Sequence, residues 1–335
     1  MSGSITEPPP VDEGTTAEGF VPTFRRGARL DAVLAELFPD HSRTRLGDLA
    51  RAGHVRVDGR PRRASYRVAG GEHLLLFVPA ALVPGPDRPE PRPLDVVHED
   101  ADLLVLDKPA GLSVHPGAGR PAGTLLNALL AHDPSLVALP RAGLVHRLDR
   151  DTTGLLLVAR TPFAYRRLVA DMAARAIRRG YDALVWGVPP AAGTIDAPLA
   201  RHPHLRTRRA VVPTGRPART HFTRCRRGPG LALLALRLET GRTHQIRVHL
   251  AHAGHPVVGD GVYGGRRPPP AALPESARAA LAATRRQMLH AARLAFAHPR
   301  DGRSLSFSAP WPEDMARLLA LLALVDESPE ELRPW

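Results

Sequence analysis

The chain has almost no cysteine and almost no lysine. Its 335 residues include one cysteine, Cys225, and one lysine, Lys108. A single cysteine excludes an internal disulfide and any cysteine-based zinc cluster within one chain. Because structural disulfides belong to oxidising compartments, this composition fits a reducing one, and we expect a cytoplasmic protein.

Long apolar runs are also missing. The longest, Leu318 to Val325, is far shorter than the roughly 20 apolar residues that a membrane-spanning helix needs. The sequence shows neither an amphipathic basic presequence nor a cleavable apolar leader. We therefore expect no membrane partner.

Arginine, by contrast, is abundant. Lysine and arginine together number 46 against 33 acids, a formal net charge of +13. Residues 201–249 hold twelve arginines and one acid, Glu239. So dense a like-charge segment repels itself unless a polyanion lies across it, and guanidinium groups bind phosphate and stack on bases. A GC-rich genome explains arginine in place of lysine, whereas an RNA partner explains the excess charge.

The composition changes along the chain predict four segments. Residues 1–19 are acidic and poor in large apolar side chains, which predicts a disordered tail. Residues 20–80 form a compact basic unit, because apolar residues recur at helical spacing over 30–37 and 46–50. Residues 81–93 are rich in proline and predict an extended linker. A second domain, 94–335, follows.

The small unit also carries a hairpin signal. V-R-V-D-G-R-P, from Val55 to Pro61, alternates like a strand and contains an Asp-Gly turn. Between Val21 and Val78, eleven arginines face six acids. Two interpretations stay open at this point: an RNA-binding module, or a plain helical subdomain with a solvated basic face.

The second domain mixes strand and helix patterns without strict alternation. Short apolar runs at 103–106, 155–158 and 231–238 predict strands, and helical patterns lie around 125–131, 165–176 and 279–292. This arrangement favours an α+β fold over a doubly wound one.

The most informative segment runs from Gly143 to Arg160 and contains H-R-L-D-R-D-T-T-G. It sets Asp149 between Arg147 and Arg150, directly before an apolar strand. A carboxylate among cations stays ionised, so it can serve as a nucleophile or a base. The alternative is a surface strand with an incidental ion pair. We expect Asp151 to brace the turn that follows, because short Asp side chains bond nearby backbone amides.

Three further segments carry polar residues in a distinctive order. They are E-D-A-D-L-L-V-L-D-K-P-A-G-L-S-V-H-P-G (99–117), I-R-R-G-Y-D-A-L-V-W-G (177–187) and E-T-G-R-T-H-Q-I-R-V-H-L-A-H-A-G-H-P-V-V-G-D-G-V-Y-G (239–264). In the last, Thr243 is a candidate cap for a helix over 244–252, which Ala253-Gly254 would end.

These motifs, with the strand-like segments 287–299 and 305–312, resemble the RluA-type pseudouridine synthases. The resemblance implies a mixed, largely antiparallel catalytic domain in which Asp149 is the catalytic residue. It implies that Tyr181 faces the active site and that Arg247 pairs with Asp149. The expected RNA-contacting residues are Arg147, Lys108, Arg242, His244 and Gln245. The small unit, with R-L-D-A-V-L-A and G-H-V-R-V-D-G-R, resembles the S4 RNA-binding module.

The resemblance implies isomerisation of uridine to pseudouridine in a structured RNA by a monomer, without metal or cofactor. Large-subunit ribosomal RNA is the favoured substrate, and transfer RNA is the alternative. A non-catalytic RNA-binding or ribosome-assembly factor, and a base-releasing glycosylase, are the competing functions. Four histidines at 244, 249, 252 and 255 lie close in sequence. No acid or cysteine sits beside them as a further ligand, so we expect them to contact phosphate or local backbone groups.

Overall fold

The computed structural model describes residues 14–38, 43–79, 88–117, 122–205 and 207–327. The chain divides into two compact units, residues 1–88 and 89–335. The boundary between them falls inside the predicted linker, 81–93, of which residues 81–87 lie outside the described part. The end of that segment belongs to the second unit, because Glu90 exchanges hydrogen bonds with Asn127 and Gly123 there.

The first unit packs two helices, α1 (Leu30–Leu37) and α2 (Arg43–Arg51), with a four-stranded antiparallel sheet of order β1-β4-β2-β3. The strands are β1 (Gly14–Phe20), β2 (Val55–Val57), β3 (Arg60–Pro61) and β4 (His73–Pro79). The predicted helical spacing is confirmed, because Leu30, Leu34 and Leu46 lie in one buried cluster. The predicted hairpin is confirmed as well: Asp58 and Gly59 both have positive φ, as a type I′ turn requires.

The predicted tail, 1–19, is wrong at its C-terminal end. Residues 14–20 form β1, which pairs along its whole length with β4. Composition misses such a strand because backbone pairing with a neighbouring strand, and not apolar content, holds an edge strand in place. Residues 1–13 lie outside the described residues.

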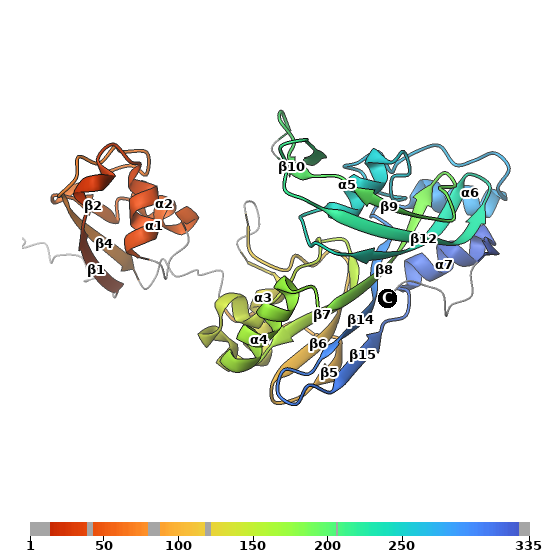
Figure 1. Cartoon of the computed structure of the whole chain (residues 1–335), viewed down its shortest axis with the longest axis horizontal. Helices are drawn as coiled ribbons and strands as arrows, with labels where there is room; N and C mark the ends of the chain where they lie inside the picture. The colour runs from red at the N-terminus through yellow and green to blue at the C-terminus, as the bar shows by residue number, and fades with distance from the viewer. Residues whose placement is uncertain (1–13, 39–42, 80–87, 118–121, 206, 328–335) are drawn as a thin grey trace, which may run out of the picture. The chain divides into compact units, whose positions relative to one another are not determined.

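The second unit is built on a ten-stranded mixed sheet of order β16-β12-β13-β8-β14-β7-β6-β5, with β9 beside β12 and β15 beside β14 (Figure 1). Its pairings are antiparallel except that between β14 and β7. The strands are β5 (Val96–Glu99), β6 (Leu103–Lys108), β7 (Thr153–Ala159), β8 (Arg178–Trp186), β9 (Ala192–Asp196), β12 (Arg219–Gly228), β13 (Leu231–Leu238), β14 (Leu289–Ala297), β15 (Ser304–Ser308) and β16 (Val325–Asp326). Two short strands, β10 (Leu199–Arg201) and β11 (Arg209–Val211), pair separately.

Helices cover both faces of this sheet. They are α3 (Leu125–His132), α4 (Pro162–Ala173), α5 (Gln245–His252), α6 (Glu275–Ala283) and α7 (Glu313–Leu322). Successive residues of a strand point to opposite faces. Leu104 and Leu106 accordingly pack with α3 and α5, whereas Leu103 and Val105 pack with α4. Helices α6 and α7 cover the other half of the α4 face. The expected α+β fold is confirmed.

One predicted helix is wrong in its second half. The pattern over 279–292 predicts a helix, but α6 ends at Ala283 and β14 begins at Leu289. Strand β14 lies between β8 and β7 and is buried over most of its length. A strand covered on both faces is apolar without alternation, so its sequence does not distinguish it from a buried helix.

No helix in the described ranges has both the length and the apolar character that crossing a bilayer requires.

Two short 3₁₀-helical segments, η2 (Pro134–Ala138) and η3 (Pro140–Gly143), lead from α3 toward the loop that carries Asp149.

Gly154 fixes the junction between β7 and β14. Its φ is +109°, and a Cβ there would lie 2.3 Å from the carbonyl oxygen of Ala291. We expect Gly154→Ala to lower the free energy of unfolding by more than about 4 kcal/mol, because backbone on the neighbouring strand must move. Gly111→Ala is the matched control: φ is also positive there, but no atom lies within 4 Å of the added Cβ. Its cost should stay at roughly 1–2 kcal/mol in urea unfolding, and equal losses in the two variants would contradict this explanation.

Candidate active site

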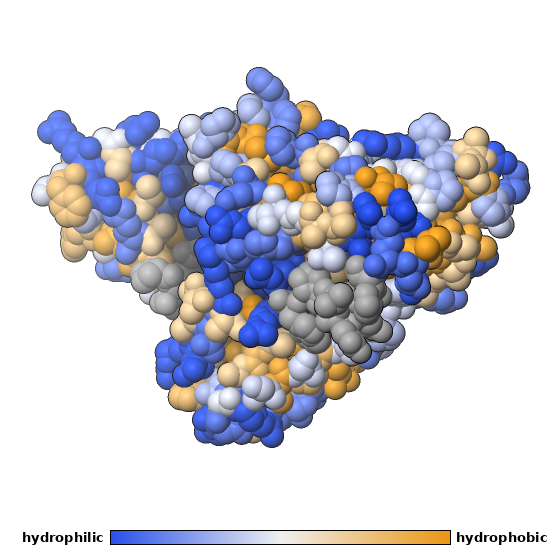
Figure 2. Space-filling view, turned by 45° about the vertical axis from the view of Figure 1, so that its right-hand side comes forward, coloured by the Kyte–Doolittle hydropathy of each residue, from blue (hydrophilic) through white to orange (hydrophobic). Residues whose placement is uncertain are grey.

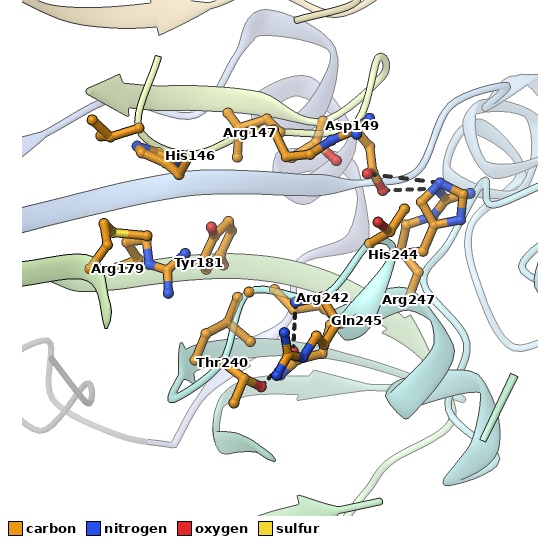
Figure 3. A pocket seen from close by; sticks show the side chains of 18 of the residues that line it. His146, Arg147, Asp149, Arg179, Tyr181, Thr240, Arg242, His244, Gln245 and Arg247 are labelled. Atoms are coloured by element: carbon orange, nitrogen blue, oxygen red, sulfur yellow. Dashed lines mark hydrogen bonds and ion pairs between the residues drawn. The ribbon is translucent and has the colours of Figure 1, made fainter. Parts of the chain in front are cut away.

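A pocket of about 700 Å³ opens where the loop before β7, strand β8 and the segment before α5 meet (Figure 3). Six arginines and two acids line it. Seven of the eight residues predicted for the site are among its lining: Arg147, Asp149, Tyr181, Arg242, His244, Gln245 and Arg247. The eighth, Lys108, is not. Residues distant in the sequence are thus brought to one cavity.

Asp149 lies in the tight loop that precedes β7. Its backbone carbonyl accepts a hydrogen bond from Thr152, which closes the turn. The side chain of Asp149 is 15 % exposed and faces the pocket. Leu148, just before it, is buried in the main core cluster and anchors the loop to the domain.

Arg247 holds this carboxylate. Its Nη1 donates to Asp149 Oδ2 at 2.9 Å, while its Nε and Nη2 donate to the two oxygens of Asp260 at 2.7 and 3.0 Å. The predicted pairing of Arg247 with Asp149 is therefore present. Burial alone would lower the pKa of Arg247, but the hydrogen bonds and charges of the two carboxylates outweigh it and raise that pKa.

Asp260 was missed by the sequence reading. Its side chain is fully buried, and it also accepts backbone hydrogen bonds from Val262 and Tyr263. Burial would raise the pKa of Asp260, yet the Arg247 hydrogen bond lowers it. The sequence offers only a second acid in a motif with two arginines, Arg242 and Arg247. The two-point contact of Asp260 with Arg247 becomes visible only in three dimensions.

His244 is the second basic side chain beside the carboxylate (Figure 3). Its Nε2 lies 3.9 Å from Asp149 Oδ1, and its Nδ1 lies 2.7 Å from the Tyr263 hydroxyl. Burial lowers the pKa of His244, against the opposing charge of Asp149, so the ring favours its neutral form. The Arg247 guanidinium stacks 5.0 Å from the same Tyr263 ring.

Tyr181 lies on β8, 5 % exposed, and lines the pocket. Burial raises the pKa of its hydroxyl, which therefore keeps its proton. A ring with one polar tip can stack on a base and still form a hydrogen bond at its edge.

Gln245, predicted to contact RNA, makes its side-chain hydrogen bonds within the protein. Its Oε1 accepts from Thr240 and from the Arg242 amide, and its Nε2 donates to Arg219 and Thr220. The amide has two donors and two acceptor sites, and the protein uses all four. The prediction of an RNA contact is wrong because Gln245 is fully engaged in shaping the 240–244 loop.

The predicted phosphate contact of Lys108 is wrong too. The side chain is 1 % exposed, and its Nζ donates to the carbonyls of Pro109, Leu112 and Arg150. Three acceptors satisfy an ammonium completely. The bond to Arg150 attaches Lys108 to the loop directly after Asp149, so it supports that loop from inside.

Two local expectations also change. Asp151 does not brace the Thr152-Thr153-Gly154 turn; its carboxylate lies against the Arg150 guanidinium. Helix α5 begins at Gln245, and its N-cap is His244 in the left-handed region, with no side-chain capping bond. The predicted Thr243 cap is therefore wrong. The predicted end is confirmed, since Ala253 caps the helix and Gly254 has a φ of +85°.

The clustered histidines bind local groups. Both ring nitrogens of His249 have partners, Thr220 and the Ala197 carbonyl, and His255 contacts the Trp186 carbonyl. Within the described ranges, no group of three or more His, Cys, Asp or Glu side chains has a metal-binding arrangement.

The rim of the pocket is cationic. Arg141, Arg147, Arg175 and Arg242 are exposed there. In the space-filling view, hydrophilic surface dominates the middle of the visible face and apolar surface is broken into smaller patches (Figure 2). Such a rim attracts the phosphates of a nucleic acid and leaves base selection to the deeper walls.

Comparison with known proteins agrees with this geometry. A family model described as RNA pseudouridylate synthase matches residues 102–252, and an S4 domain model matches 28–74. Ribosomal large subunit pseudouridine synthase D of Xanthomonas campestris pv. campestris is 46 % identical over 322 residues, covering 96 % of each chain. The protein of that name in Haemophilus influenzae is 48 % identical over 313 residues, covering 91 % of this chain and 95 % of the relative.

A solved structure gives the same result. Human RNA Pseudouridylate Synthase Domain Containing 1 has a TM-score of 0.56 at 26 % identity, covering 72 % of this chain and 95 % of that one. The fold and site thus define an RNA-modifying isomerase. The chain belongs to the RNA pseudouridine synthase family, in the branch that carries an N-terminal S4 domain.

Asp260 should act by holding Arg247. We expect Asp260→Asn to lower kcat about 100-fold with little change in KM, because the amide cannot accept both guanidinium hydrogen bonds and Arg247 shifts on Asp149. Tritium release from RNA labelled at C5 of uridine measures both constants. Asp326→Asn, which breaks the exposed pair with Arg226, is the control. A rise in KM alone would instead show that Asp260 serves RNA binding.

Burial of Lys108 makes the free energy of unfolding depend on pH. Burial lowers its pKa to about 8, against 10.5 for the free side chain. Between these values the unfolded chain binds more protons than the folded one, so the free energy of unfolding should rise with pH. We expect urea unfolding at pH 8–9.5 to show this rise in the wild type and a flatter dependence in Lys108→Met. Because Lys108 is the only lysine, parallel curves would refute the assignment.

Proposed function

We propose that this protein isomerises specific uridines of large-subunit ribosomal RNA to pseudouridine, with Asp149 as the catalytic carboxylate. The proposal includes action as a cytoplasmic monomer without metal or cofactor, as the sequence indicates. The names of the two bacterial relatives support the choice of substrate. The S4 domain in residues 28–74 supplies a second surface for a structured RNA.

The reaction makes three demands on the site. The bond between N1 and C1′ breaks, a bond between C5 and C1′ forms, C5 loses its hydrogen and N1 gains a proton. The uridine must first leave its helix, at a cost of a few kcal/mol, to expose these atoms. The detached uracil must then be held while it turns. A pocket of about 700 Å³ has room for the extruded nucleotide and for a flanking phosphate.

The observation that carries the proposal is the Asp149–Arg247 pair at 2.9 Å inside this pocket. A carboxylate in an electrostatically fixed position can act on the ribose, either by attacking C1′ or by removing the C2′ proton. Arg247 keeps the carboxylate charged and aimed, and Asp260 keeps Arg247 aimed.

The remaining walls suit the other two demands. Tyr181 offers a buried ring for the base. The exposed arginines at the rim, among them Arg147 and Arg242, suit the phosphates on either side of the extruded uridine. Arg147 stands two residues before Asp149, is exposed and lines the pocket.

Asp149→Asn should abolish turnover and leave RNA affinity nearly unchanged, because the amide keeps the shape but cannot act as nucleophile or base. Tritium release from C5-labelled ribosomal RNA measures turnover, and filter binding measures affinity. Asp151→Asn is the matched control, since that carboxylate lies against Arg150 outside the pocket.

Wild-type rates in Asp149→Asn would end the catalytic assignment, and free uracil among the wild-type products would indicate a glycosylase instead. The substrate is tested separately by carbodiimide primer extension on ribosomal RNA from a deletion strain, with and without the restored gene. Unchanged pseudouridines there, with changes in transfer RNA, would contradict the ribosomal substrate.

A further inference from the structure

Arg179 is a buried arginine without a hydrogen-bond or ion-pair partner among the described residues. It lies on β8, 8 % exposed, and it lines the pocket. Its Nε is buried without a hydrogen-bond partner, and within the described part of the chain its guanidinium forms no hydrogen bond or ion pair. By contrast, Arg247 holds two carboxylates, and Arg175 pairs with Glu239 at 2.8 Å.

A buried guanidinium nitrogen without an acceptor is costly. Burying a charged donor without an acceptor costs several kcal/mol, so such groups persist mainly where a ligand completes them. His146, which lines the same pocket, also has a ring nitrogen without a hydrogen-bond partner among the described residues. The Leu157 amide donates to His146 Nε2, which puts the proton of the neutral ring on Nδ1, and this Nδ1 is buried without a partner.

The position of Arg179 indicates which part of the ligand it meets. Arg179 and Tyr181 are two residues apart on one strand and so point to the same face. In the close-up, Asp149, Tyr181 and Arg179 follow one another across the pocket (Figure 3). With the ribose at Asp149 and the base on the Tyr181 ring, the Arg179 guanidinium lies toward the far edge of the base.

The far edge of uracil has a useful symmetry. In uridine, the ring atom opposite the bond to the ribose at N1 is C4, which carries O4. In pseudouridine, the atom opposite the bond at C5 is C2, which carries O2. A donor placed opposite the ribose therefore meets a carbonyl oxygen before and after the ring turns. Cytidine presents an amino group there, and two donors repel each other.

We propose that Arg179 donates a hydrogen bond to the carbonyl oxygen opposite the ribose, and so selects uridine over cytidine and retains the detached ring. This inference rests on the proposed function. A phosphate is the less suitable partner, because the exposed arginines of the rim suit phosphates, whereas Arg179 is buried in the wall. Buried polar groups discriminate strongly against a ligand that leaves them unpaired.

The test pairs a change in the protein with a change in the base. Arg179→Met is assayed on RNA whose target is uridine or 4-thiouridine, a poorer acceptor at position 4, with products separated by chromatography after digestion. We expect the wild type to lose roughly 10- to 100-fold in kcat/KM on the thio substrate. Arg179→Met should lose a similar factor on uridine and show little further loss on 4-thiouridine, because the two changes remove one interaction.

Arg178→Met is the matched control, since Arg178 is the exposed neighbour on the same strand. It should keep the wild-type kcat/KM on uridine and the wild-type loss of kcat/KM on 4-thiouridine. Arg179→Lys retains the charge and keeps the test valid if the methionine variant does not fold; it should show an intermediate loss and a reduced sensitivity.

If both Arg179 variants lost as much kcat/KM on 4-thiouridine as the wild type does, the proposal would be overturned. A methylphosphonate removes the charge of the phosphate beside the target uridine. If the Arg179 variants lost their sensitivity to this change and not to sulfur, Arg179 would contact the RNA backbone, which would equally overturn the proposal. A wild-type enzyme that forms no pseudouridine in ribosomal RNA would refute the proposed function alone, since Arg179 could still be coupled to the base in another RNA.

Discussion

The structure of this site depends on one guanidinium shared by two carboxylates. Arg247 binds Asp260 through two hydrogen bonds and Asp149 through one. The two-point contact with Asp260 fixes the plane of the guanidinium, and Nη1 then fixes Asp149. The fully buried acid is the support and the partly exposed one is free to meet substrate. Because the buried Arg247 guanidinium and the buried Asp260 carboxylate pair with each other, the arrangement avoids the cost of an unpaired buried ion.

The sheet brings these groups together. Tyr181 comes from β8, a strand in the middle of the sheet, and Asp149 from the loop before β7, two strands away. Arg247 comes from α5, which packs on the face that α3 also covers. Since β8 is buried along nearly its whole length, its inward side chains have few alternative rotamers. The precision of the pocket therefore comes from the core, and the loop before β7 supplies only the Asp149 carboxylate.

Three buried cations show how differently one charge can be used. Lys108 gives all its donors to backbone carbonyls and supports the loop after Asp149. Arg247 gives its donors to carboxylates and orients Asp149. Arg179 has an Nε without a hydrogen-bond partner among the described residues, and it lines the pocket. In the sequence all three are simply basic residues inside motifs. Only the position of their acceptors separates a structural role from an electrostatic or a binding role.

The sequence by itself determined the elements whose signals are local. Helical spacing over 30–37, the Asp-Gly turn and the apolar runs of β6, β7 and β13 correspond to observed elements. The motif segments also contain most of the residues that line the pocket, seven of which were predicted as site residues. Tertiary structure decided what depends on distant partners. Strand β1 exists because β4 lies beside it, and β14 is a strand because β8 and β7 enclose it.

The same reason separates the site residues that were predicted from those that were not. Asp149 was found through the motif around it, although the cation that pairs with it, Arg247, lies 98 residues away in the chain. Asp260 and Arg179 have no such signal, and Lys108 and Gln245 carry a misleading one. A hydrogen bond depends on where its partner lies in space, and a partner many residues away in sequence becomes visible only when the chain has folded.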